Sequence, residues 1–162
     1  MKTNIFEIIH SEFGTEEFNI VNSKYNLYKS EEGIWEFTIY FDTSSPIKRS
    51  EELKKVIDAK PDFEATALLL PDDLKLYEGK IIHQKNGYDY KREEHLSNVY
   101  YFEHNSIEEL EVKIIEYHKD WIILDIKGKA IINGSNGNDP DSELLIYQTK
   151  FNLDEKLKRD VM

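Results

Sequence analysis

The sequence predicts an α+β domain dominated by antiparallel β-sheet, in a curved, sandwich or barrel-like arrangement, with one internal helix at about residues 50–59 and a short carboxyl-terminal helix. Apolar and polar residues alternate in most segments, which is the period of a half-buried strand. Asn, Asp, Gly and Pro gather between these segments, where turns are expected. No linker or composition shift divides the 162 residues, so we expect a single domain, 1–162.

The clearest strands lie within 107–133, where two apolar-rich runs flank a tight turn and predict an antiparallel hairpin. The opposite row of the second run is mixed and includes Trp121 and Asp125, the first place to look for a partner if this row is exposed. Residues on alternate positions of that run form the predicted core face: Ile122, Leu124, Ile126, Ala130 and Ile132.

The amino-terminal part predicts short strands at 5–10, 18–21 and 25–28, followed by a better defined strand at 34–42. This last segment is rich in aromatic and branched residues, as half-buried strands are. One face of it carries Trp35, Phe37, Ile39 and Phe41, and the other carries Glu36, Thr38, Tyr40 and Asp42.

The internal helix is expected to begin at Ser50, whose hydroxyl can cap it, and to end before Pro61. Further strands are expected at 63–70, from 74 or 76 to 84, and at 99–102, with a hairpin turn at Asn86-Gly87. The charged run 91–95 fits either a helical turn or a loop.

After the hairpin, a long loop of turn-forming residues is expected at 134–142, followed by a strand at 144–153. The carboxyl-terminal helix is expected at 154–161, where the basic residues lie towards the end that the helix dipole favours.

Acidic residues outnumber basic ones, 32 to 21, which gives a formal charge of -11 and disfavours binding to nucleic acid. The same charge favours association with a basic protein. The chain has no cysteine, so we expect cytoplasmic residence without disulfides. We find no signal-peptide pattern and no apolar stretch long enough to span a membrane, and we expect no membrane partner.

No nucleophile, nucleotide-binding or zinc motif occurs, so the sequence assigns no reaction, no cofactor and no metal. The loop 134–142 is rich in oxygen ligands, but its spacing differs from that of an EF-hand, and a polar turn is the preferred interpretation. The oligomeric state stays open.

Two kinds of site are therefore considered. Exposed acids and aromatics suit a basic protein partner, and the candidates are Glu36, Tyr40, Asp42, Trp121 and Asp125. The alternative is a small-ligand or enzymatic pocket in a curved sheet, lined by Tyr100, Tyr101 and His104 with a carboxylate. A structural subunit of a larger assembly is a third possibility.

In size, acidity, lack of cysteine and lack of motif, the chain is similar to the small cytoplasmic immunity proteins that bacteria make against the toxins of their neighbours. The resemblance is one of general character and covers no motif. It implies a protein without enzymatic activity that neutralises a basic toxin domain.

Overall fold

The structure, a computed structural model, describes residues 3–11, 13–55, 60–101, 103–132 and 141–154. These residues form a nearly all antiparallel fold in which ten strands make one sheet, in the order β5-β10-β11-β12-β1-β2-β3-β4-β8-β9, and β6 pairs with β7. The strands are β1 (Ile5–His10), β2 (Gly14–Lys29), β3 (Trp35–Lys48), β4 (Asp62–Leu69), β5 (Ile81–Gln84), β6 (Tyr88–Asp89), β7 (Glu94–His95), β8 (Asn98–Tyr101), β9 (Glu103–Ser106), β10 (Glu108–Tyr117), β11 (Trp121–Ala130) and β12 (Ser142–Leu153).

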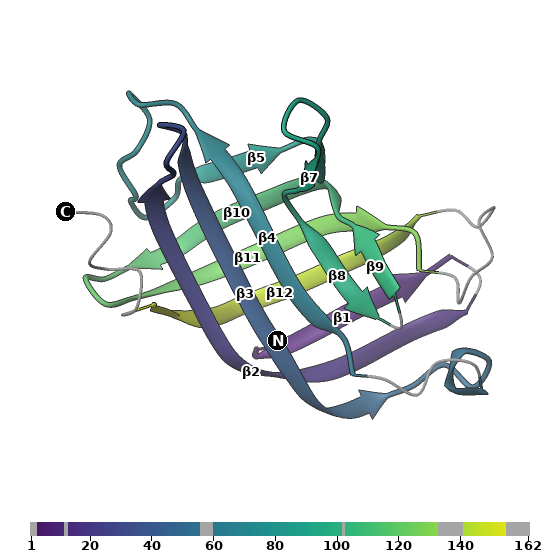
Figure 1. Ribbon diagram of the computed structural model, residues 1–162. Helices are drawn as coiled ribbons and strands as arrows, with labels where there is room; N and C mark the ends of the chain where they lie inside the picture. The colour runs from purple at the N-terminus through teal and green to yellow at the C-terminus, as the bar shows by residue number, and fades with distance from the viewer. Residues whose placement is uncertain (1–2, 12, 56–59, 102, 133–140, 155–162) are drawn as a thin grey trace.

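The large sheet curves until its two halves face each other as layers (Figure 1). In this view β2, β3, β4 and β8 cross in front of β10, β11 and β12. β2 belongs to both layers, because it pairs with β1 near its start and, in parallel, with the end of β12 further on. A register shift between Val21 and Lys24, with Asn22 at a φ of 54°, marks the bulge that lets the strand bend.

Aromatic and aliphatic side chains fill the space between the layers. Phe41 and Phe63 stack with their ring centroids 4.9 Å apart, and Phe6 meets the two rings edge-on at 5.3 and 5.7 Å. The predicted antiparallel hairpin within 107–133 is confirmed as β10 and β11. Its expected core residues are all buried: Ile122, Leu124, Ile126, Ala130 and Ile132.

The predicted α+β class is wrong, because the described residues contain no α-helix. Over 50–59 the structure shows a single 3₁₀ turn, Leu53–Lys55, and residues 56–59 lie outside the description. Ser50 does cap this turn, since its Oγ accepts a 3.4 Å hydrogen bond from the Leu53 backbone N–H. Of the carboxyl-terminal helix predicted at 154–161, only Asp154 is described, and it is not helical; residues 155–162 lie outside the description.

Other boundaries also differ from the prediction. The hairpin turn expected at Asn86-Gly87 does not form, because β5 pairs with β10 and not with the segment that follows it. Gly87 instead allows a close backbone approach: a Cβ there would lie 2.3 Å from the Ile107 carbonyl oxygen. The charged run 91–95 lies in the small hairpin formed by β6 and β7.

Candidate functional site

Strand register brings polar side chains of four neighbouring strands together on the outer side of the front layer. Tyr40 of β3 lies opposite Glu64 of β4, and Asp62 of β4 lies opposite Tyr100 of β8. Tyr100 in turn lies opposite His104 of β9. Because cross-strand partners point to the same face of a sheet, these side chains share one surface.

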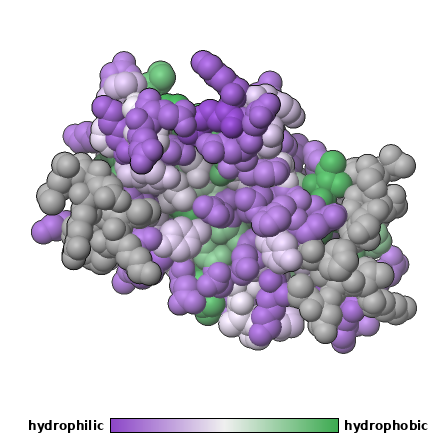
Figure 2. Space-filling view, viewed as in Figure 1, coloured by the Kyte–Doolittle hydropathy of each residue, from purple (hydrophilic) through white to green (hydrophobic). Residues whose placement is uncertain are grey.

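This surface is hollowed, and we name the hollow the acidic groove. Its volume is about 750 Å³, and it is open to solvent. On the side of the molecule seen in Figure 1, the surface is largely hydrophilic, with small hydrophobic areas between the polar side chains (Figure 2). The groove is lined by Tyr40, Phe41, Asp42, Asp62, Phe63, Glu64, Asn98, Tyr100, His104 and Asp154.

The charged side chains that line the acidic groove are acidic. Four carboxylates line it, and among the residues that the structure describes no lysine or arginine does. Partial burial, together with the nearby Asp42 carboxylate, raises the pKa of Asp62 above its ordinary value. Two carboxylates that repel each other in this way favour a cation between them.

The walls of the groove carry hydrogen-bonding aromatic groups. The rings of Tyr100 and His104 lie 4.7 Å apart, and His104 Nδ1 is 2.9 Å from Asn98 Oδ1. Because an amide oxygen can only accept, Nδ1 carries the proton in this arrangement. The Tyr40 hydroxyl donates a hydrogen bond to the Asp154 carboxylate. Burial and that hydrogen bond raise the pKa of Tyr40, so the phenol stays protonated at neutral pH.

The groove joins residues that the sequence had assigned to two different sites. Tyr40 and Asp42 were candidates for a protein interface, whereas Tyr100 and His104 were candidates for a ligand pocket, and all four line the same hollow. Tyr101, the neighbour of Tyr100, points the other way and is buried in the core.

Tyr101 belongs to a buried polar network centred on Glu16 of β2. Its hydroxyl donates to Glu16 Oε1 at 2.8 Å, and Arg49 Nε donates to Oε2 at 2.6 Å. His10 Nε2 lies 2.9 Å from Oε1, and its Nδ1 lies 3.2 Å from the Ser142 hydroxyl. Glu16, His10 and Ser142 are all buried, so this network fastens strands together within the fold.

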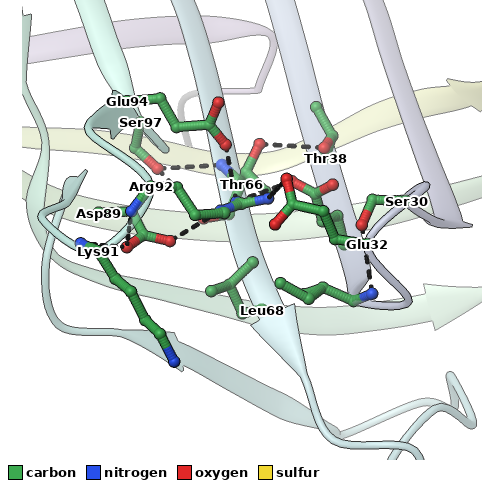
Figure 3. A network of polar contacts seen from close by, with 12 residues as sticks. Ser30, Glu32, Thr38, Thr66, Leu68, Asp89, Lys91, Arg92, Glu94 and Ser97 are labelled. Carbon is green, nitrogen blue, oxygen red and sulfur yellow. Dashed lines mark hydrogen bonds and ion pairs between the residues drawn. The ribbon is translucent and has the colours of Figure 1, made fainter.

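Glu36, another interface candidate, is covered by the β6–β7 hairpin. Its carboxylate lies 3.6 Å from Arg92 Nη2 of that hairpin. Arg92 also forms ion pairs with three further carboxylates, and its side chain is only 11% exposed. The dashed lines in Figure 3 show this arginine reaching over β4. The other ion-pair partners are Glu32 at 4.0 Å, Asp89 at 2.9 Å and Glu94 at 3.0 Å.

Trp121 and Asp125 lie in the other layer and do not approach the acidic groove. The ring of Trp121 is stacked on His118 at 3.7 Å, and Lys150 Nζ lies 4.8 Å from its centroid. Asp125 accepts a 2.8 Å hydrogen bond from the backbone N–H of Gln148. Both side chains are half-buried and already have partners within the protein, which makes them weaker candidates for a binding surface.

Four polar lining residues were missed by the sequence analysis: Asp62, Glu64, Asn98 and Asp154. Asp62 and Glu64 alternate with the buried Phe63 and Ala65, so an earlier start of the predicted strand at 63–70 would have placed both acids on its outer face. Only the strand order shows that this face adjoins Tyr40.

Comparisons of the chain with protein-family models, with curated proteins and with solved structures find no match. Within the described residues, no group of three or more His, Cys, Asp or Glu side chains is arranged to hold a metal ion. Of the loop expected at 134–142, residues 134–140 lie outside the description, and Ser142 begins β12. The described part of the chain also contains no helix of the length and apolar character needed to cross a membrane.

Proposed function

We propose that this protein binds a basic partner protein through the acidic groove. The observation that carries the proposal is the composition of the groove: four carboxylates and two phenols around about 750 Å³, with no lysine or arginine among the described lining residues. A cationic side chain entering there gains attraction from several acids and can pack against the faces of Tyr40 and Tyr100.

The use that we propose for this binding is inhibition, in the manner of an immunity protein that neutralises a basic toxin domain. Support comes from the size, the acidity and the lack of cysteine of the chain, and a cytoplasmic location is part of the same proposal. If a toxin encoded beside this gene remains equally toxic when this protein is co-expressed with it, the inhibitory role is wrong.

Binding through the groove can be tested with a hexalysine peptide and isothermal titration calorimetry at low salt. The test variant combines Asp42→Asn with Asp62→Asn, which removes two charges from the groove. The matched control combines Asp72→Asn with Glu78→Gln, which removes two charges from exposed positions outside it. We expect the groove variant to weaken binding about tenfold and the control to weaken it by less than about threefold. Equal losses in the two variants would show that net charge, and not the groove, attracts the peptide.

A small organic cation is a second candidate, because the volume of the groove lies within the range of ligand pockets, about 300–1,000 Å³. His104 and the Asp42/Asp62 pair would then be the groups available for proton transfer. Tight binding of a polyamine such as spermine, with weak binding of hexalysine, would favour this candidate over a protein partner.

A further inference from the structure

The outer row of β3 continues beyond the acidic groove and passes beneath the β6–β7 hairpin. Glu36, Thr38, Tyr40 and Asp42 occupy alternate positions of this row, so Glu36 lies about 13 Å from Tyr40 along the strand. Thr38 and Thr66 separate the two ends, with their hydroxyls hydrogen-bonded at 3.0 Å. One end of the row is the groove, and the other is the recess that Arg92 fills.

We define the guanidinium recess by the four carboxylates around Arg92, those of Glu32, Glu36, Asp89 and Glu94. Four negative charges surround one positive charge, which leaves a local excess of three. Arg92 Nη2 is buried and has no partner of hydrogen-bond geometry among the described residues, although the Glu36 and Glu94 carboxylates lie close to it. The recess therefore holds a guanidinium between carboxylates of two different segments.

Arg92 lies in the small β6–β7 hairpin. β6 and β7 have two residues each, and they form a sheet of their own. Isolated two-stranded hairpins are marginally stable at best. At the base of the hairpin, the backbone N–H groups of Leu96 and Ser97 donate to the Gly87 carbonyl at 2.8 and 3.0 Å. Beyond that base, His95 Nδ1 lies 3.2 Å from the Ser106 hydroxyl, and ion pairs of Arg92 hold the hairpin against Glu36 of β3 and Glu32 of the β2–β3 turn.

We infer that the guanidinium recess is a second subsite for the basic partner and that Arg92 occupies it in the unbound protein. An arginine of the partner displaces Arg92, the hairpin opens, and the recess joins the acidic groove along the outer row of β3. This inference rests on the proposed function. It assigns the recess to arginine and not to lysine, because the planar fork of a guanidinium can reach several carboxylates at once, as Arg92 does.

The binding test compares hexa-arginine with hexalysine on the full chain and two variants. Arg92→Gln removes the internal occupant of the recess. Lys91→Gln is the matched control, since it removes the same charge from an exposed side chain of the same hairpin. We expect Arg92→Gln to bind hexa-arginine at least about fivefold more tightly than the unaltered protein. We expect Lys91→Gln to gain less than about twofold.

Hydrogen exchange gives a readout that does not depend on affinity. Hexa-arginine should accelerate exchange at the Leu96 and Ser97 amides of the unaltered protein, whereas hexalysine should not. The same amides should exchange faster in Arg92→Gln without any peptide. Should that variant fail to fold, Arg92→Lys provides the test, because it keeps the charge and loses the fork. It should then show a smaller gain in hexa-arginine affinity.

The outcomes separate this inference from the proposed function. Suppose that both peptides bind through Asp42 and Asp62, but Arg92→Gln neither tightens hexa-arginine binding nor accelerates exchange at the Leu96 and Ser97 amides. The proposed function then stands, and Arg92 only stabilises the fold. If neither peptide binds the protein or its Arg92 variants, both proposals fail. Tighter hexa-arginine binding to Lys91→Gln than to Arg92→Gln would also overturn the inference.

Discussion

Glu16 is a carboxylate with no solvent exposure, and its charge depends on neighbours from several strands. Burial opposes ionisation, but hydrogen bonds from His10, Arg49 and Tyr101 and from the Ser50 backbone N–H outweigh it. The pKa of Glu16 is therefore held below its ordinary value near 4.5. The network that achieves this links β1, β2 and β8 with the segment that follows β3.

We expect Glu16→Gln to lower the free energy of unfolding by about 3 kcal/mol, because it leaves the Arg49 guanidinium without its closest carboxylate. Since the folded-state pKa is depressed, the contribution of Glu16 is fully present above pH of about 4.5 and is lost as the pH falls through the folded-state pKa. Urea unfolding at a series of pH values should show the two proteins converging towards acid. The exposed variant Glu52→Gln serves as control, and a difference that stays constant with pH would contradict this account.

The contribution of Asp62 to stability changes with pH in the opposite direction to that of Glu16. Its folded-state pKa is raised by partial burial and by Asp42, so its ionisation costs stability as the pH rises from its ordinary pKa near 3.8 through the raised one. We expect Asp62→Asn to stabilise the protein at neutral pH by less than about 1 kcal/mol, because solvent still screens much of the repulsion between Asp62 and Asp42. Thermal unfolding at pH 7 and below pH 4 should show a gain at pH 7 alone. The same variant should bind hexalysine more weakly, as expected of a residue that serves binding at a cost in stability.

At the level of elements, alternation in the sequence located strands well and their ends poorly. The strand at 5–10 and the hairpin within 107–133 are confirmed, since each consists of strands that pair with a neighbour in sequence. β2 was divided into two because Asn22 and Ser23 interrupt the alternation. In the structure that interruption is a bulge within one strand, which bends without ending.

The wrongly predicted helix and the wrongly predicted turn have a common cause. Ser50, the acids after it and Leu53 are good local signals for a helix, yet the described residues between β3 and β4 form only the 3₁₀ turn Leu53–Lys55, and the Ser50 backbone N–H donates to the Glu16 carboxylate of β2 at 3.1 Å. Asn86-Gly87 is a good local signal for a hairpin, yet β10 is the strand that pairs with β5. In both places contacts between distant segments override a local preference.

At the level of the whole molecule, the composition predicted a basic partner but could not place its surface. Two of the five interface candidates, Tyr40 and Asp42, line the acidic groove. The sequence alone does not show that the other lining residues join Tyr40 and Asp42, because the groove is assembled from four strands whose order is set by long-range pairing. The same pairing explains why Tyr100 and Tyr101, neighbours in sequence, lie on opposite faces of β8.

The net charge of -11 acts at a longer range than the groove does, and kinetics can separate the two contributions. Raising the salt from about 0.01 M to about 0.1 M shortens the Debye length from about 30 Å to about 10 Å. We expect the association rate constant for hexa-arginine to fall over this range while the dissociation rate constant changes little, because steering acts before contact. Stopped-flow fluorescence with a labelled peptide measures both constants.

The variants sharpen this prediction. Asp72→Asn/Glu78→Gln alters charge outside the groove and should lower the association rate constant alone. Asp42→Asn/Asp62→Asn removes contacts made after docking and should mainly raise the dissociation rate constant. A salt effect confined to dissociation would contradict steering by the net charge. An unchanged dissociation rate constant in the groove variant would mean that the acids of the groove act only through the net charge. The partner surface would then have to lie elsewhere on the molecule.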